Sequence, residues 1–151
     1  MIYLLDTDLL IFMIRGTKAR VRQAGQRHRA ATLVARCQAA QAAGDSVGLS
    51  ALTVSELEFG ARNSGDYERE IAAVRKILTP FDVYDYDAIS CPGQYGRIRH
   101  ELEASGQTIG SMDLLIAAHA FALDATVVTN NDEHFSRVRG LHVANWLTPI
   151  C

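Results

Sequence analysis

Short apolar runs that stop at polar residues, separated by long helical patterns, constrain the fold of this chain most strongly. "MIYLL" ends at Asp6, which is typical of a strand buried on both faces. The sequence predicts further strands from "SVGLSAL", "FDVYDY", "ATVVTN" and "LHVANW". Strands that alternate with helices indicate an α/β fold. We therefore expect a parallel, twisted sheet of about four to five strands, with helices covering both faces.

The helices are predicted from cap residues and chain breakers. Thr53 and Glu56 have the spacing of a capping box, and Ser111 can cap the helix that follows it. Gly25 is a possible break in an alanine- and arginine-rich stretch, and Pro92 should kink or delay a helix. The expected helices cover residues 8–14, 18–43 (as one or two helices), 53–62, 66–78, 87–104, 111–123 and 132–138.

The composition predicts one globular domain over residues 1–151. Hydrophobic residues make up 48% of the chain without any run long enough to cross a bilayer, which excludes a disordered chain and a membrane protein. The acids in "MIYLLDTD" exclude a signal peptide, so we expect a cytoplasmic protein. Cys37, Cys91 and Cys151 have no close spacing, which favours free thiols over disulfides or a zinc site.

Basic residues are distributed unevenly, although the formal net charge is only −2. From Arg15 to Arg36 the chain carries seven basic residues and no acid. Arginine supplies 13 of the 15 basic residues, and its guanidinium binds phosphate and carboxylate through paired donors. The stretch is either a solvated helix face or a basic surface for nucleic acid or an acidic partner.

Acidic and amide side chains follow the predicted strands. Asp6 ends the first strand, Glu56 lies in the first turn of the helix after the second, and Asn131 follows "ATVVT". Asp113 opens an apolar helix, where an unpaired carboxylate would be costly. Because the carboxyl ends of parallel strands meet at one edge of a sheet, these oxygens predict a site for Mg²⁺ or Mn²⁺. Taken singly, each residue also fits an ordinary strand end, capping box, helix cap or turn.

Four stretches carry a resemblance to a known family: "YLLDTD", "LTVSELEFGA", "GRIRHELEASGQTIGSMDLLIAAHA" and "VVTNNDEHFSRVRGLHVANW". Together they resemble the PIN-domain ribonucleases, and most closely the VapC toxins of bacterial toxin–antitoxin pairs. The resemblance implies a single PIN-like domain. It also implies a catalytic set of Asp6, Glu56, Asp113 and Asn131, in which the three acids hold Mg²⁺ or Mn²⁺.

Other residues near this set follow from the same resemblance. Thr7 and Thr129 match hydroxyl positions close to the family's site, and Asp132 stands beside Asn131. Three features depart from the family pattern. Asp8 stands where asparagine is common, Cys91-Pro92-Gly93 interrupts a helix that is usually continuous, and the stretch 15–44 is longer than in the shortest members.

The function implied by the resemblance is that of a Mg²⁺-dependent endoribonuclease that cleaves structured RNA, with tRNA as the first expectation, and leaves a 5′-phosphate. The implied partners are a small VapB-like antitoxin and a second copy of the chain in a homodimer. We expect His119 to pack or support the site rather than catalyse, and Tyr95 to be an ordinary tyrosine rather than a base-stacking one. The candidates for binding RNA phosphates are Arg15, Arg20, Arg22, Arg97 and Arg99.

Two alternatives belong to other functional classes. "LLDTDLL" also resembles the strand end of aspartyl-phosphate phosphatases of the HAD-like group, in which Asp6 would attack phosphate with help from Asp8. Leu10 does not suit that motif, and nothing around Lys76 suggests the lysine that it needs. The second alternative is a PIN module that binds RNA without cleaving it.

Overall fold

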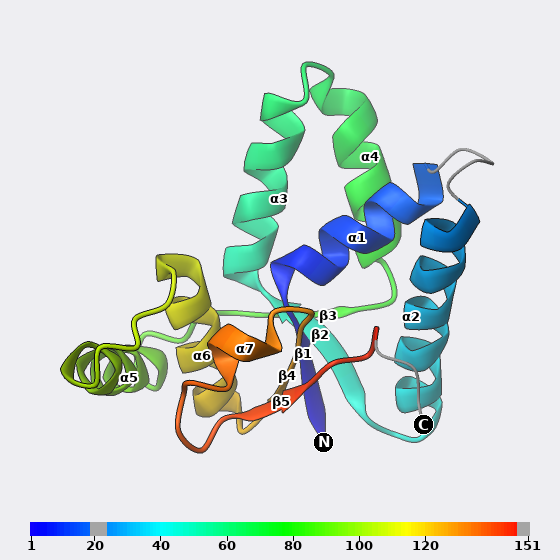
Figure 1. The fold of residues 1–151 in the computed structure, drawn as a ribbon. Helices are drawn as coiled ribbons and strands as arrows, with labels where there is room; N and C mark the ends of the chain where they lie inside the picture. The colour runs from blue at the N-terminus through cyan, green and yellow to red at the C-terminus, as the bar shows by residue number, and fades with distance from the viewer. Residues whose placement is uncertain (19–23, 148–151) are drawn as a thin grey trace.

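The strands form one parallel sheet. The structure, a computed structural model, describes residues 1–18 and 24–147. Five strands pair in the order β3-β2-β1-β4-β5, all parallel, which confirms the predicted fold class (Figure 1). Leu4 of β1 pairs with Gly48 of β2 and with Val127 of β4, so β1 lies at the centre. The strands are β1 (Ile2–Leu5), β2 (Ser46–Ser50), β3 (Asp82–Tyr84), β4 (Thr126–Val128) and β5 (His142–Ala144).

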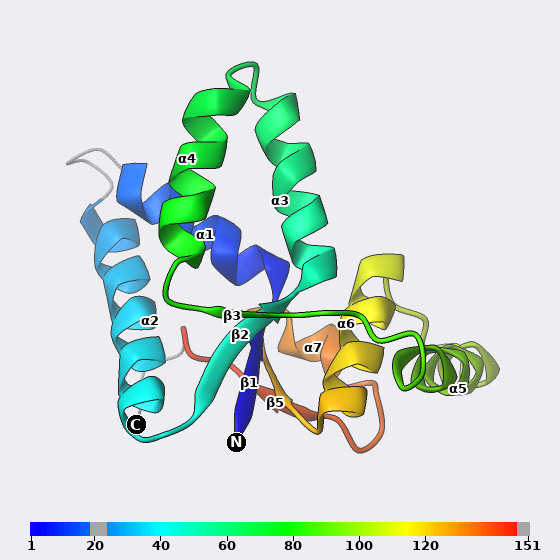
Figure 2. The ribbon, with the colours of Figure 1, turned by 180° about the vertical axis from the view of Figure 1, so that it is seen from behind.

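Helices cover both faces of this sheet, as Figures 1 and 2 show from opposite sides. They are α1 (Thr7–Lys18), α2 (Ala24–Ala42), α3 (Ala51–Asn63), α4 (Tyr67–Leu78), α5 (Cys91–Ala104), α6 (Ser111–Leu123) and α7 (Asp132–Phe135). Among the helices of the described residues, none combines the length and the apolar character that crossing a bilayer requires. Arg20, Arg22 and Cys151 lie outside the described residues.

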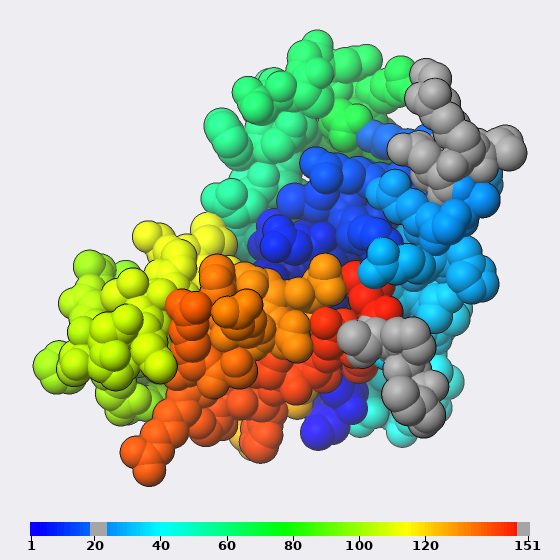
Figure 3. All heavy atoms as spheres, in the orientation of Figure 1, coloured from blue at the N-terminus to red at the C-terminus, as the bar shows by residue number. Residues whose placement is uncertain are grey.

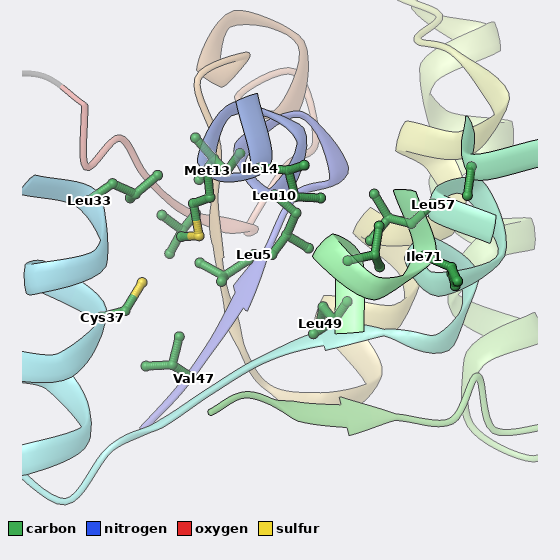
Figure 4. Packing of buried hydrophobic residues seen from close by; sticks show 14 residues of the cluster. Leu5, Leu10, Met13, Ile14, Leu33, Cys37, Val47, Leu49, Leu57 and Ile71 are labelled. Carbon is green, nitrogen blue, oxygen red and sulfur yellow. The ribbon is translucent and has the colours of Figure 1, made fainter. Parts of the chain in front are cut away.

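Alternating side chains of the central strands divide the core in two. Leu5 and Val128 face a cluster built with α1, α2, α3 and α4 (Figure 4). Leu4 and Val127 face a second cluster built with α5, α6 and α7. Because successive strand residues point to opposite faces, a run of apolar residues such as "YLL" is what a strand between two layers of helices requires. Cys37 lies in the first cluster as a free thiol, and burial raises its pKa to about 12.

Helix α3 begins earlier than its sequence predicts. Its N-cap is Ser50, whose Oγ accepts a hydrogen bond from the Leu52 amide at 3.1 Å. The predicted capping box of Thr53 and Glu56 is therefore wrong: Thr53 is buried inside the helix, and Glu56 lies in the second turn. The physical reason is that β2 ends at Ser50, and a serine at the end of a strand is an equally good cap.

Three other predicted boundaries also differ. Gly110 rather than Ser111 is the N-cap of α6, and its backbone is extended as a cap requires. Helix α5 begins at Cys91 rather than at residue 87, so the delay predicted from Pro92 is confirmed. Pro92 stands in the first turn, where a missing amide proton costs nothing, and it does not interrupt the helix. Gly25 lies inside α2 and does not break it, since α2 already begins at Ala24.

A glycine sets the closest approach between α1 and α2. A Cβ atom added at Gly16 would lie 2.3 Å from the Cβ of Ala30. We therefore predict that Gly16→Ala destabilises the protein by about 1–3 kcal/mol through overpacking. Gly96→Ala, in α5 with open space around it, should be neutral or stabilise by up to about 1 kcal/mol. Urea unfolding of both variants measures this, and a Gly16→Ala protein as stable as wild type would contradict the predicted packing.

Candidate active site

The Asp6 carboxylate lies buried where β1 ends. The Asp6 amide donates to the carbonyl of Val128 at 2.9 Å, which continues the pairing of β1 with β4. Its Oδ1 accepts from the Thr7 amide at 2.8 Å, and its Oδ2 accepts from Thr129 Oγ1 at 2.9 Å. The residue is only 3% exposed. Two donors therefore fix the carboxylate with little help from water.

The surroundings of the Asp6 carboxyl raise its pKa. Burial raises its pKa from 3.8 to about 6. The hydrogen bond from Thr129 and that from the Thr7 amide lower the pKa, and the charges of Asp8 and Asp113 raise it. Asp8 is exposed at the start of α1, yet its charge reaches the site. This extra negative charge is what we expect where the family commonly has a neutral asparagine. The cluster is thus poised to accept positive charge.

Asp113 reaches the same region from the first turn of α6. Its side chain is 22% exposed, and burial raises its pKa, with a smaller contribution from Asp8. His134 acts in the opposite direction: its Nδ1 lies 3.6 Å from Asp113 Oδ2. The N-terminal end of a helix also favours a carboxylate through the helix dipole. This explains why a carboxylate stands in an otherwise apolar helix.

The segment after β4 links the two carboxylates. Thr129 Oγ1, which donates to Asp6, accepts from the Asn131 amide at 2.8 Å. The Asn131 side chain donates through Nδ2 to Asp113 Oδ2 at 3.5 Å and contacts His134 Nδ1 at 2.9 Å. The structure thus brings together Asp6, Asp113, Thr129 and Asn131 as the sequence predicted. Figure 3 shows the α7 segment (orange) beside the start of α1 (dark blue) on one face.

Sequence reasoning missed His134. His134 lies three residues after Asn131, which is the N-cap of the short helix α7. Side chains at this spacing lie on the same side of a helix, so the sequence could have placed these two together. Thr7 differs in detail from its prediction. Its amide binds Asp6, whereas its hydroxyl lies 3.0 Å from the hydroxyl of Thr53 in α3.

Glu56 and Asp132 lie outside this cluster. Glu56 is exposed and lines a groove between α1, α3 and α4, and the carboxylates that raise the pKa of Asp6 are Asp8 and Asp113. Asp132 is exposed, and its Oδ1 accepts from Asn145 at 3.4 Å. A role for either residue in the reaction stays a prediction.

Arg97 and Arg99, two of the arginines proposed to bind RNA, are engaged on α5. Arg97 pairs with Glu101 at 3.3 Å and lies over the ring of Phe121 at 4.8 Å. Arg99 pairs with Glu103 at 2.9 Å. Exposed pairs of this kind contribute little and exchange easily, so both guanidinium groups remain able to meet a phosphate. Arg15 is exposed at the groove that Glu56 lines.

The donor set fits a hard divalent cation only in part. Across residues 1–18 and 24–147, no group of three or more His, Cys, Asp and Glu side chains is gathered closely enough to hold a metal ion. Asp6 and Asp113 nevertheless supply carboxylate oxygens, and each carboxylate feels added negative charge that a cation would neutralise. The residues fit a cation at these two carboxylates, without Glu56 in the arrangement described.

Comparison with known proteins agrees with the fold. The profile of the PIN domain family matches residues 3–141, and the chain belongs to that family. It is 32% identical to ribonuclease VapC2 of Rickettsia felis over 146 residues, which covers 97% of this chain and 98% of that protein. It is 33% identical to the tRNA(fMet)-specific endonuclease VapC of Shigella flexneri over 144 residues, or 95% and 97% of the two chains. The resemblance to VapC toxins is confirmed.

Solved structures give the same result. The structure of VapBC2 from Rickettsia felis bound to a promoter DNA fragment contains a chain that matches with a TM-score of 0.80 and 32% identity, covering 97% of this chain and 99% of that one. A chain of VapBC-1 from nontypeable Haemophilus influenzae matches with a TM-score of 0.78 and 29% identity, covering 98% and 100%. The fold of this chain is therefore that of the toxin-like members of the family.

The raised pKa of Asp6 predicts a pH-dependent effect of removing its charge. Above pH 6 the Asp6 carboxyl is charged in both the folded and the unfolded protein, but the charge costs free energy only where it is buried, in the folded state. Asp6→Asn removes that cost and should therefore stabilise the metal-free protein at pH 8. A shift from 3.8 to about 6 corresponds to about 3 kcal/mol at most. The gain should shrink as the pH falls through 6 and vanish below 4, where Asp6 is neutral in both states.

Thermal unfolding in EDTA at pH 8 and pH 4 measures this difference. Asp124→Asn is the matched control, because Asp124 is an exposed aspartate at the other end of α6, at a left-handed position that asparagine tolerates. It should change the melting temperature little at either pH. A lower melting temperature for Asp6→Asn at pH 8 would contradict the cost assigned to its charge.

Proposed function

We propose that the protein is a Mg²⁺- or Mn²⁺-dependent endoribonuclease that acts as the toxin of a VapBC-type pair. The observation that carries the proposal is the buried Asp6 carboxylate, fixed by Thr7 and Thr129 and close enough to Asp113 for the two charges to interact. Membership of the PIN domain family and the ribonuclease relatives support it. The same membership removes the support for an aspartyl-phosphate phosphatase.

In this proposal the chain's own residues hold and orient the reacting groups. Asp6 and Asp113 bind the cation, and Asn131 keeps Asp113 in place through its side-chain amide. When bound, Mg²⁺ or Mn²⁺ supplies positive charge that stabilises the scissile phosphate and lowers the pKa of the attacking water. Thr129 holds Asp6 so that its oxygens need not reorganise during the reaction. The product carries a 5′-phosphate, as the resemblance implies.

The proposed substrate is structured RNA, and tRNA is the first candidate. We propose that cleavage takes place in the cytoplasm. The support is a relative, the Shigella flexneri endonuclease, whose name specifies tRNA(fMet). Arg15, Arg97 and Arg99 are exposed, as residues that bind phosphates must be. Such contacts set affinity and salt dependence rather than sequence preference. The proposed homodimer follows from the resemblance alone and stays a prediction.

Loss of either central carboxylate should abolish cleavage. We predict that Asp6→Asn and Asp113→Asn each lower kcat for tRNA cleavage in Mg²⁺ by at least about 100-fold, because each removes an oxygen charge that binds the cation. Glu56→Gln should cost less than either, since Glu56 faces a groove rather than Asp6. Asp124→Asn, a matched exposed aspartate of α6, should keep full activity.

Single-turnover cleavage of labelled tRNA, with 5′ ends mapped, gives these rates. Asp8→Asn is a useful addition, because it would abolish the activity of an aspartyl-phosphate phosphatase and should leave the activity of a PIN nuclease intact. Wild-type protein that binds tRNA but never cleaves it in Mg²⁺ or Mn²⁺ would favour the alternative of a non-catalytic module. Full cleavage by Asp6→Asn would sink the proposed site.

An antitoxin is the proposed protein partner, and its proposed docking site is a groove of about 390 Å³ between α1, α3 and α4. The related solved structures are VapBC assemblies, which supports such a partner. Ile11, Ile14, Leu57 and Val74 give the groove an apolar floor that suits one face of an amphipathic helix. Of the basic stretch from Arg15 to Arg36, the described residues Arg15 and Lys18 line this groove beside the apolar helices.

The charges at the groove suggest how a bound antitoxin would inhibit. Lys18 already pairs with Glu70 there, and Glu56 stands on the same wall. A chain that leaves the groove could place an arginine against Asp6 or Asp113, where a charge-assisted contact in a partly desolvated cleft would be strong. Such an arginine would compete with the cation.

Filling the groove should block this partner without harming the toxin. Gly60 lies exposed on α3 at the groove, with no atom within 4 Å of an added Cβ. We predict that Gly60→Phe weakens binding of the antitoxin encoded beside the toxin by at least about tenfold, a loss of about 1.4 kcal/mol. Gly93 is exposed on α5 with equally open space, so Gly93→Phe should leave antitoxin binding unchanged. Calorimetric titration measures both, and equal affinities would refute the groove as the docking site.

A further inference from the structure

His119 is fully buried in α6, in the same helix as Asp113, and the proposed reaction does not use it. Its Nδ1 lies 2.8 Å from Ser50 Oγ, and its Nε2 has no hydrogen-bond partner among the described residues. The ring of Tyr86 meets it edge-on, with the ring centroids 5.6 Å apart. Burial lowers the pKa of His119 and outweighs the opposite effect of Asp85, whose backbone and charge raise it. An imidazole is an expensive way to fill an apolar site, unless its bond to Ser50 has a purpose.

The partner in that bond is the N-cap of α3. Ser50 Oγ accepts from the Leu52 amide and also binds His119. A hydroxyl has one proton and two lone pairs, so it can serve both partners at once. The bond therefore joins α6 directly to the first turn of α3, across residues that lie far apart in the sequence.

From α3, hydrogen-bond contacts lead to the active-site acid. Thr53 of α3 lies 3.0 Å, hydroxyl to hydroxyl, from Thr7, and the Thr7 amide donates to Asp6. Asp6 accepts from Thr129, Thr129 accepts from the Asn131 amide, and the Asn131 side chain donates to Asp113. Asp113 stands in α6, where the path began. We call this closed path, from His119 through α3, Asp6 and Asn131 back to Asp113, the hydrogen-bond circuit.

We propose that His119 is a positioning residue: its bond to Ser50 closes the hydrogen-bond circuit and so fixes Asp113 relative to Asp6. The inference rests on the proposed function, since it concerns how the two carboxylates are held for the cation. Without the bond, α6 can shift against α3 while its apolar face stays packed. Asp113 would then move relative to Asp6, which is anchored separately by Thr7 and Thr129.

Three substitutions separate the bond from simple packing. His119→Asn keeps a polar atom near the position of Nδ1, His119→Gln places one near Nε2 instead, and His119→Leu keeps volume without polarity. Leu102→Ala is the matched control, because Leu102 is buried in the core cluster that α5 and α6 share but takes no part in the circuit. It should lower thermal stability without changing the active site.

The measurements are Mn²⁺ affinity by calorimetry, and kcat and KM for tRNA cleavage, at a temperature where every variant is folded. We expect His119→Leu and His119→Gln to lose at least about tenfold in both Mn²⁺ affinity and kcat, with KM within about twofold of wild type. His119→Asn should recover most of both. Leu102→Ala should lose melting temperature only. A role in stability alone would move the melting temperature and leave Mn²⁺ affinity unchanged.

Two results would overturn the inference. One is wild-type Mn²⁺ affinity and kcat in folded His119→Leu, and the other is an equal loss in His119→Asn and His119→Leu. If His119→Leu does not fold, Ser50→Gly removes the same bond from its other end, because glycine still serves as an N-cap. A wild-type protein that does not cleave RNA would instead refute the proposed function, and the Mn²⁺ affinities would still test the circuit.

Discussion

The buried carboxylate of Asp6 is the interaction on which the rest of the site depends. A carboxylate that is 3% exposed loses most of its hydration, and its pKa near 6 records that cost. Two hydrogen bonds offset part of the cost, and each comes from a different element: the Thr7 amide at the start of α1 and the Thr129 hydroxyl after β4. What remains is a local destabilisation that a bound cation would relieve. Such a site trades stability for function.

The order of the strands makes this arrangement possible. Because β1 is central and β4 lies beside it, residues that follow these two strands meet at one edge of the sheet. The first turn of α6 arrives at the same edge, and its helix dipole favours Asp113 there. The opposite faces of β1 anchor two separate cores through Leu4 and Leu5, so the edge is held from both sides.

Much of this could be predicted from the sequence, where a local pattern dictates the structure. The apolar run before Asp6 and the run in "ATVVTN" predicted β1, β4 and the polar residues near their ends, although β4 already ends at Val128. The place of Asp113 followed from its helix. The predictions failed where two local solutions compete. Ser50 and Thr53 are both good caps, and only the length of β2 decides between them, so Glu56 was placed one turn too early.

Contacts between distant segments had no sequence signal. The pairing of Thr7 with Thr53 and of His119 with Ser50 depends on how α1, α3 and α6 meet at the carboxyl ends of the strands. The sequence could suggest that His119 packs or supports the site, but not what it binds. The groove depends on the same kind of contact, because residues of α1, α3 and α4 form it together.

The most direct test of the account is the pKa of Asp6, measured from the chemical shift of its carboxyl carbon by NMR, with and without Mg²⁺. Burial and the neighbouring acids should give Asp6 a pKa near 6 in the metal-free protein. Saturating Mg²⁺ should lower it well below its ordinary value, because a cation favours the carboxylate. A metal-free pKa near 4, or one that Mg²⁺ leaves unchanged, would contradict the claim that Asp6 is held in place to bind a divalent cation.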